Sequence, residues 1–93
     1  MRVSGNAELV HALGKEIAAR RAELEYSQED LAGHCELDRP YISLIEVGRK
    51  QPTISVLLIL ATGLKLTLEE LAGRVEQRYL KETRARRRSS SAG

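Results

Sequence analysis

Residues 26–46 read YSQEDLAGHCELDRPYISLIE and contain two short amphipathic segments separated by three residues, ELD. The first segment opens with Ser27, a favoured N-cap, and Asp30 follows three residues later, where it can complete a capping box. The second segment opens with Asp38, a strong N-cap, and continues with Pro40, which a helix tolerates only in its first turn. The stretch therefore predicts two short helices joined by a tight turn.

Helical spacing of apolar residues continues on both sides of this stretch. It predicts one helix before it, over residues 7–24. The two short helices are expected to end near Cys35 and at Gly48, a residue suited to the left-handed conformation that stops a helix. Two more helices are expected, one from Thr53 to about residue 64 and one from Thr67, with Glu70 as its capping-box partner. The pattern allows the second of them to continue through residue 85. Because the alternating pattern of strands is absent, the predicted fold is all-α with five helices.

The length of 93 residues suits one small domain. We expect this domain to occupy residues 1–73, and residues 74–93 to extend the fifth helix and end in a disordered basic tail, RRRSSSAG. Apolar residues make up 42% of the chain, and Phe and Trp are absent, so the core should be aliphatic. Residues 1–73 contain eight Lys/Arg and eleven Asp/Glu, whereas residues 74–93 contain seven and two. Net charge alone therefore does not identify a nucleic-acid-binding body.

The single cysteine, Cys35, cannot form an internal disulfide, which fits a reducing compartment. No segment has the layout of a signal peptide, and the longest aliphatic run, ISVLLILATGL, is too short to span a bilayer. We expect a cytoplasmic, nucleoid-associated protein with no membrane partner. His11, His34 and Cys35 do not form a metal-ligand pattern, and no phosphate-binding glycine loop is present, so we expect no metal, no cofactor and no enzyme activity.

Two helices with this spacing match a helix-turn-helix, whose first helix crosses the DNA backbone and whose second lies in the major groove. The stretches SQEDLA, LDRPYISLIEVGRKQP and LTLEEL give the chain a clear resemblance to the Cro/C1-type (XRE-like) helix-turn-helix family over Ile17 to Leu71. The resemblance implies a compact lambda-repressor-like domain. It also implies binding to double-stranded DNA, although an isolated SQ or IE dipeptide would carry no such weight.

Four positions at helix starts and in the following loop are expected to meet DNA. Gln28, at the start of the first short helix, matches a family position that holds a phosphate. Arg39 begins the second short helix and can bind O6 and N7 of guanine in the major groove. Arg49 and Lys50, in the loop after that helix, match family positions that contact backbone phosphates.

The other candidate contacts of the second short helix are less polar than in many relatives. Pro40 and Leu44 can offer only apolar contacts, for example to a thymine methyl group, where family members often carry polar side chains. Ser43 can donate to a base or a phosphate. The Tyr41 hydroxyl can bind a phosphate, or the ring can simply pack on the turn; both remain open.

The resemblance further implies an ion pair between Arg21 and Glu46, which occupy core-facing positions of two different helices. It also highlights three departures from the family pattern. Glu25, Glu36 and Lys65 stand where relatives carry turn glycines, so these residues are expected to adopt the left-handed conformation at a modest cost.

The predicted helix over residues 53–64 is apolar almost all round, which is typical of a helix buried on more than one side. Its core face is expected to contain Ile54, Leu57, Leu60, Ala61 and Leu64. Val56, Leu58 and Ile59 lie outside or at the edge of that face, and we expect them to form a homodimer interface. A dimer would set two recognition helices about 34 Å apart over a palindromic site.

These patterns together predict a sequence-specific DNA-binding transcriptional regulator that acts as a homodimer on a palindromic operator. The alternative is an antitoxin or another protein-interaction module built on the same fold. The basic segment KETRARRR, residues 81–88, would serve as a nonspecific DNA arm, as a segment that binds a protein partner, or as a solubilising tail.

Overall fold

The computed structural model describes residues 6–92, with side chains described as far as Arg88. It contains five helices: α1 (Ala7–Glu23), α2 (Gln28–Cys35), α3 (Arg39–Glu46), α4 (Ile54–Gly63) and α5 (Leu68–Ala92). Residues 6–92 contain no strand. The predicted all-α, five-helix fold is confirmed, and the helix starts agree with the expected ones within one residue at each cap.

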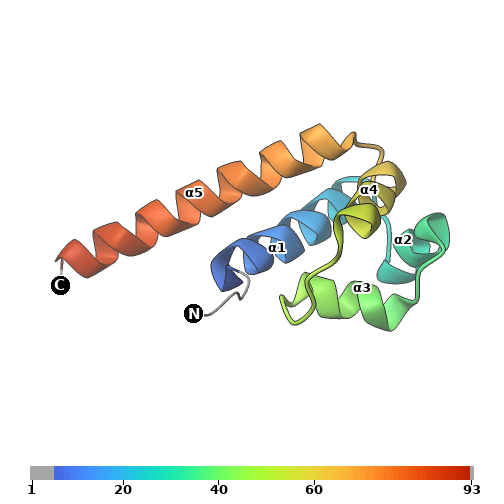
Figure 1. The fold of residues 1–93 in the computed structure, drawn as a ribbon, viewed down its shortest axis with the longest axis horizontal. Helices are drawn as coiled ribbons and strands as arrows, with labels where there is room; N and C mark the ends of the chain where they lie inside the picture. Colours follow the sequence, from blue (N-terminus) through green and yellow to red (C-terminus); the bar gives the residue numbers. More distant parts are fainter. Residues whose placement is uncertain (1–5, 93) are drawn as a thin grey trace.

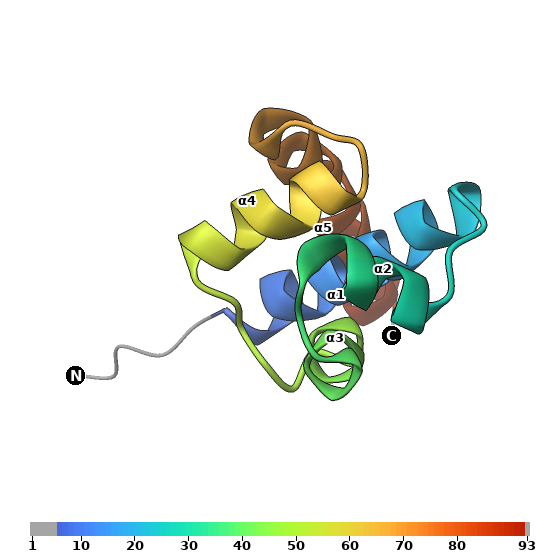
Figure 2. The same cartoon turned by 90° about the vertical axis from the view of Figure 1, so that its right-hand side faces the viewer.

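Helix α1 is the centre of the molecule. It packs against α5 on one side and against α3 on the other, so α5 and α3 lie on opposite edges (Figure 1). Helices α2 and α4 pack on each other and close the domain at the end where α3 begins (Figure 2). This arrangement leaves the outer side of α3 uncovered along the lower edge of both views.

Side-chain caps fix most of the helix starts. Ser27 and Asp30 form the expected capping box, and Thr53 accepts a hydrogen bond from the backbone N–H of Val56. Asp38 occupies the N-cap position of α3, but its side chain makes no capping hydrogen bond, contrary to expectation. Pro40, at the second helical position, has no N–H to donate, and the next N–H, that of Tyr41, bonds to the carbonyl of Asp38 instead.

Three turns use left-handed residues that are not glycine. Glu25, Glu36 and Lys65 have φ values of 58°, 55° and 60°, the conformation expected at these positions. A residue with a Cβ adopts this conformation at a cost of about 1–2 kcal/mol. Gly48 has φ 77°, and a Cβ atom there would lie 2.4 Å from Nδ1 of His11, so any other residue would also have to displace this side chain.

The core is aliphatic, as the composition predicts. The fully buried side chains come from all five helices: Ile17, Leu31, Ile42, Ile45, Leu60, Leu64 and Leu71. One expected core residue, Ile54, is instead 66% exposed. It is the first residue of α4, and this end of the helix lies at the edge of the molecule (Figure 2).

Helix α5 is longer than the sequence predicts. The expectation of a disordered tail from residue 86 is wrong for residues 86–92, which continue the helix; Gly93 lies outside the described residues. Ala and Arg have high helix propensity, and residues 81–92 contain no Gly or Pro to end the helix. Arg86 also forms an ion pair with Glu8 of α1, which ties this part of α5 to the domain.

Candidate nucleic-acid interface

Helices α2 and α3 form a helix-turn-helix. The turn consists of Glu36, Leu37 and Asp38, and its sharp change of direction depends on the left-handed Glu36. The N–H of Leu37 bonds to the carbonyl of Ala32, which satisfies the end of α2. Buried Leu31 and Ile42 belong to the same core cluster, so packing as well as the turn fixes the angle between the two helices.

Helix α3 divides its residues between the core and the surface. Ile42 and Ile45 are buried, and they hold the helix against α1 and α2. Arg39, Pro40 and Leu44 are exposed, while Tyr41 and Ser43 are half-buried. The predicted base-contacting residues of α3 therefore share one continuous surface, and its first turn, with Arg39, is open to an incoming ligand.

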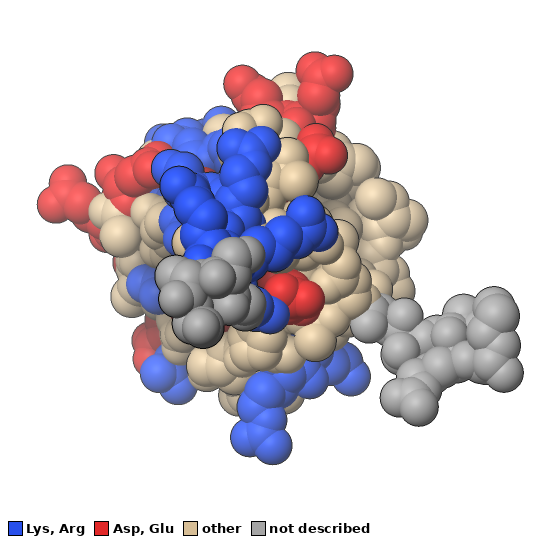
Figure 3. Space-filling model, turned by 90° about the vertical axis from the view of Figure 1, so that its left-hand side faces the viewer, with Lys and Arg blue, Asp and Glu red and all other residues tan. Residues whose placement is uncertain are grey.

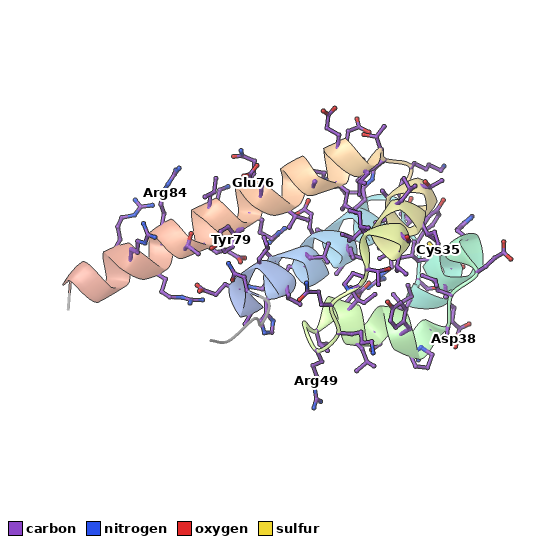
Figure 4. The ribbon with its side chains drawn as sticks, in the orientation of Figure 1. Cys35, Asp38, Arg49, Glu76, Tyr79 and Arg84 are labelled. Atoms are coloured by element: carbon purple, nitrogen blue, oxygen red, sulfur yellow. The ribbon has the colours of Figure 1, made fainter. Side chains whose placement is uncertain are left out.

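The loop after α3 adds two more cations to this surface. Arg49 and Lys50 are exposed, and Arg49 extends away from the body of the protein below α3 (Figure 4). Within the described residues, Arg39, Arg49 and Lys50 form no ion pair or hydrogen bond through their side chains. We call these three residues the open basic surface. Unpaired cations at this position can neutralise phosphates or bind guanine without first breaking an internal contact.

A charged cluster behind α3 joins three helices. Glu46, whose side chain is only 7% exposed, accepts hydrogen bonds from Nε and Nη2 of Arg21 at 2.8 and 3.0 Å. The hydrogen-bonded Glu46 carboxylate raises the pKa of Arg21, which keeps the guanidinium charged. Nη1 of Arg21 donates to the carbonyl of Tyr26 at 2.9 Å, just before α2. The pair thus has the geometry of a structural bridge between α1 and α3.

Gln28 takes part in the same cluster, which the sequence did not indicate. Its Nε2 donates to Oε1 of Glu46 at 2.9 Å, so one N–H of the half-buried amide expected at a phosphate bonds within the protein. Gln28 and Glu46 are 18 positions apart on different helices, so no local spacing links them. The sequence indicates only that Gln28 lies at the start of one short helix and Glu46 at the end of the next.

The expected interface residues of α4 separate into two kinds. Leu58 and Ile59 are exposed, by 51% and 41%, but Val56 is half-buried and packs against the core. Val56 lies one turn before buried Leu60, which explains its inward direction. An apolar groove of about 670 Å³ runs between α1, α4 and α5, lined by residues that include Leu9, Leu57, Leu68 and Tyr79.

A second set of charges lies between α1 and α5, and we call it the charged seam. Buried Glu16 accepts from Nε of Arg74 and from Nε of Arg78, each at 2.7 Å. Burial by itself raises the pKa of Glu16, but the hydrogen bonds and charges of Arg78 and Arg74 outweigh it, so the pKa is lowered. The remaining pairs of the seam are Glu23 with Arg74, Lys15 with Glu82, Arg78 with Glu82, and Glu8 with Arg86.

Other reactive groups of the described residues do not form a site. Burial raises the pKa of the Cys35 thiol, and its Sγ lies 3.6 Å from the carbonyl oxygen of Ile59. No three His, Cys, Asp or Glu side chains within residues 6–88 gather as a metal-ligand set. Over the same part of the chain, no helix has both the length and the hydropathy needed to cross a membrane.

Comparison with known proteins identifies the family to which this helix-turn-helix belongs. The helix-turn-helix family model matches residues 17–71, more than half of the chain. The control protein C.MunI from a Mycoplasma species is 36% identical over 58 residues, which cover 62% of this chain and 78% of C.MunI.

Two solved structures extend the comparison. The tetramer of the restriction-modification controller protein C.Esp1396I, in complex with its natural 35 base-pair operator, has a TM-score of 0.73 and 32% identity, covering 77% of this chain and 95% of that one. The clp gene regulator ClgR from Corynebacterium glutamicum has a TM-score of 0.83 at 19% identity, over 89% of this chain and 88% of ClgR, which supports the fold alone. The chain belongs to the Cro/C1-type helix-turn-helix family and is a DNA-binding transcription regulator.

Proposed function

We propose that this protein binds a palindromic operator as a homodimer and recognises its sequence through α3. The observation that carries the proposal is the open basic surface: Arg39, Arg49 and Lys50 are exposed and unpaired within the described residues, on the helix and loop that this fold offers to DNA. Arg39 would bind a guanine edge, and Arg49 and Lys50 would bind phosphates. Ser43, Tyr41, Pro40 and Leu44 would complete the contact surface.

The relatives support this reading over the alternative of an interaction module. C.Esp1396I is a restriction-modification controller that was solved as a tetramer on its operator, and C.MunI is named a control protein. We extend to this chain the binding of operator DNA by more than one copy. No observation among the described residues favours a toxin-binding role for the same surface.

Selection of bound duplexes from a random pool tests sequence recognition directly. We expect sequencing of the bound fraction to return an inverted repeat whose half-sites lie about 10 base pairs apart, because two recognition helices on one face of B-DNA are one turn apart. A guanine should recur in each half-site, where Arg39 reaches the major groove. If no motif is enriched above the starting pool, sequence-specific binding is wrong.

The dimer surface that we propose consists of the exposed aliphatic residues Ile54, Leu58 and Ile59 of α4. It retains Leu58 and Ile59 from the sequence prediction and replaces Val56 by Ile54, since Val56 is half-buried and packs against the core. The double variant Leu58→Lys with Ile59→Glu should sediment as a monomer and lose affinity for the full palindrome. Leu80→Lys, at an exposed aliphatic residue of α5, is the matched control and should remain dimeric.

A further inference from the structure

We propose that the outward side of α5 is a docking surface for an acidic protein segment, and that it stays accessible while α3 holds the operator. The surface consists of Lys81, Arg84 and Arg88, with the exposed Leu80 at its edge, and we call it the α5 basic face. This binding function goes beyond operator recognition, since none of these residues belongs to α3 or to its loop.

The opposite side of α5 is fixed by contacts with α1 and its N-cap. Tyr79, Glu82 and Arg86 are three or four positions apart, so they lie on one side of the helix. Each has a partner at the start of the chain or on α1, and the pairs are Asn6–Tyr79, Lys15–Glu82 and Glu8–Arg86. The last part of α5 is therefore held against α1 in one orientation, which determines the side that it turns outward.

The outward side carries positive charge without a counter-charge. Lys81, Arg84 and Arg88 are exposed, and within residues 6–88 their side chains form no ion pair or hydrogen bond. Positions i, i+3 and i+7 lie along one side of a helix, and the helical rise places them within roughly 10 Å along the axis. Residues 77–88 contain six Lys/Arg and one carboxylate, Glu82, which is engaged by Lys15 of α1. The stripe therefore favours an anionic partner.

An operator bound at α3 cannot be this partner. Arg84 points in the opposite direction to Arg49 of the open basic surface (Figure 4). The Lys and Arg side chains over the C-terminal part of α5 are also separate from the group at the lower edge of the molecule (Figure 3). A duplex docked on α3 would leave the α5 basic face turned to solvent. An anion can therefore bind there at the same time as the operator binds at α3.

Leu80 favours a protein segment over a second nucleic acid. It is 37% exposed and lies one turn before Arg84, so it borders the cationic stripe. A phosphate backbone would neutralise the cations but would give this aliphatic side chain no apolar contact. An acidic helix with carboxylates at i, i+3 and i+7 matches the stripe in spacing, and an apolar residue beside them would cover Leu80. Such a helix is complementary to both parts of the surface.

The test begins with a displayed library of random peptides, selected on the full-length protein bound to its operator. We expect the enriched peptides to contain several Asp or Glu at helical spacing and an aliphatic residue beside them. One such peptide is then synthesised, and its affinity is measured by fluorescence anisotropy with the free protein and with the operator complex. The two affinities should agree within about 2-fold, because salt screens charges that are more than about 8 Å apart. The measurement on the free protein stands even if operator recognition fails.

Two double variants of equal charge then locate the peptide. Lys81→Ala with Arg84→Ala should weaken peptide binding by about 10-fold and leave the melting temperature unchanged, since alanine suits an exposed helix. Arg49→Ala with Lys50→Ala is the matched control and should bind the peptide like wild type.

Four results would overturn the inference. One is enrichment of peptides without an acidic excess, and another is equal peptide affinity of the two double variants. A third is displacement of the peptide from the operator complex by a scrambled duplex, which would assign the α5 basic face to nucleic acid. The fourth is loss of self-association in Lys81→Ala with Arg84→Ala, which would assign the face to a second copy of the chain.

Discussion

The charged seam and the open basic surface both contain cationic side chains, but those of the seam form ion pairs within the protein and those of the open basic surface do not. In the seam, the cations Arg74 and Arg78 bind buried Glu16, and the two helices that they join form one body. On the open basic surface, Arg39, Arg49 and Lys50 project from α3 and its loop with no acidic partner among the described residues. The difference teaches that cation content says little about DNA binding in this chain. What matters is whether the Arg or Lys side chain already forms an ion pair with a carboxylate of the protein.

The two regions also lie apart in space. Lys and Arg side chains gather over the C-terminal part of α5, while a separate group projects from the lower edge of the molecule, the side on which Arg49 lies (Figures 3 and 4). Arg84, on α5, points in the opposite direction to Arg49 (Figure 4). A duplex docked on α3 would therefore not meet Arg84, which makes this exposed arginine a useful control.

The largest expected effect comes from breaking the seam. Glu16→Ala removes a carboxylate that is only 7% exposed and leaves Arg74 and Arg78 without their shared partner. We expect a loss of about 3 kcal/mol in the free energy of unfolding, measured by urea denaturation. Glu76→Ala, at an exposed glutamate of α5, should change it by less than about 0.5 kcal/mol. Equal effects of the two variants would mean that the seam contributes no stability.

The next effect concerns the first turn of α3. Arg39→Ala should weaken operator binding by about 2 kcal/mol and leave the melting temperature unchanged, because the arginine has no internal partner among the described residues. Binding is measured by fluorescence anisotropy with the selected operator. Arg84→Ala removes another exposed arginine, from α5, and should bind like wild type. If Arg84→Ala weakens binding as much as Arg39→Ala, the docking surface has been assigned to the wrong side of the protein.

A smaller effect is expected in the salt dependence of binding. Each phosphate contact by a cation contributes about −0.9 to the slope of log affinity against log salt. The double variant Arg49→Ala with Lys50→Ala should therefore flatten this slope by about 1.8 per protomer, on operator and scrambled duplexes alike. The paired control is Lys81→Ala with Arg84→Ala, which should leave the slope as it is. A flattened slope in the control and not in the loop variant would contradict the assignment.

The smallest effect is the pH dependence of the seam. The hydrogen bonds and charges of Arg78 and Arg74 outweigh the effect of burial and hold the pKa of Glu16 below its ordinary value. The carboxylate therefore stabilises the fold fully above the ordinary pKa, and this contribution is lost as the pH falls through the lowered pKa. Between pH 6 and pH 3, wild type should therefore lose more unfolding free energy than Glu16→Gln. A constant difference between the two proteins over this range would show that the ionised carboxylate is not what stabilises the seam.

Local rules predicted the helix-turn-helix well. Ser27, Asp30, Thr53 and Thr67 set helix starts through caps that involve residues three positions apart, so the sequence contains the whole interaction. The inward direction of Ile42 and Ile45 follows from their spacing in a short helix. The outward position of Arg39 follows from the same spacing. The sequence therefore also predicts which side of α3 is exposed.

Interactions between distant residues escaped prediction for a physical reason. Arg74 and Glu16 are 58 positions apart, and no periodicity within α1 or α5 indicates that they meet. The same holds for Gln28 and Glu46. The composition of residues 86–93 predicts disorder, yet the ion pair of Arg86 with Glu8 of α1 ties the helical segment to the domain. In α4, apolar residues on all sides left the core face ambiguous, and only packing decided between Ile54 and Val56.

A titration followed by backbone amide signals tests the central claim most directly. Isotope-labelled protein is mixed with increasing amounts of the selected operator, and shifts are recorded along the whole chain. The largest changes should fall within residues 38–51, which contain α3 and the open basic surface, while residues 81–88 of α5 should change little. Large changes along residues 81–88 with a quiet α3 would contradict the account, because the operator would then bind the side of the protein opposite to the recognition helix.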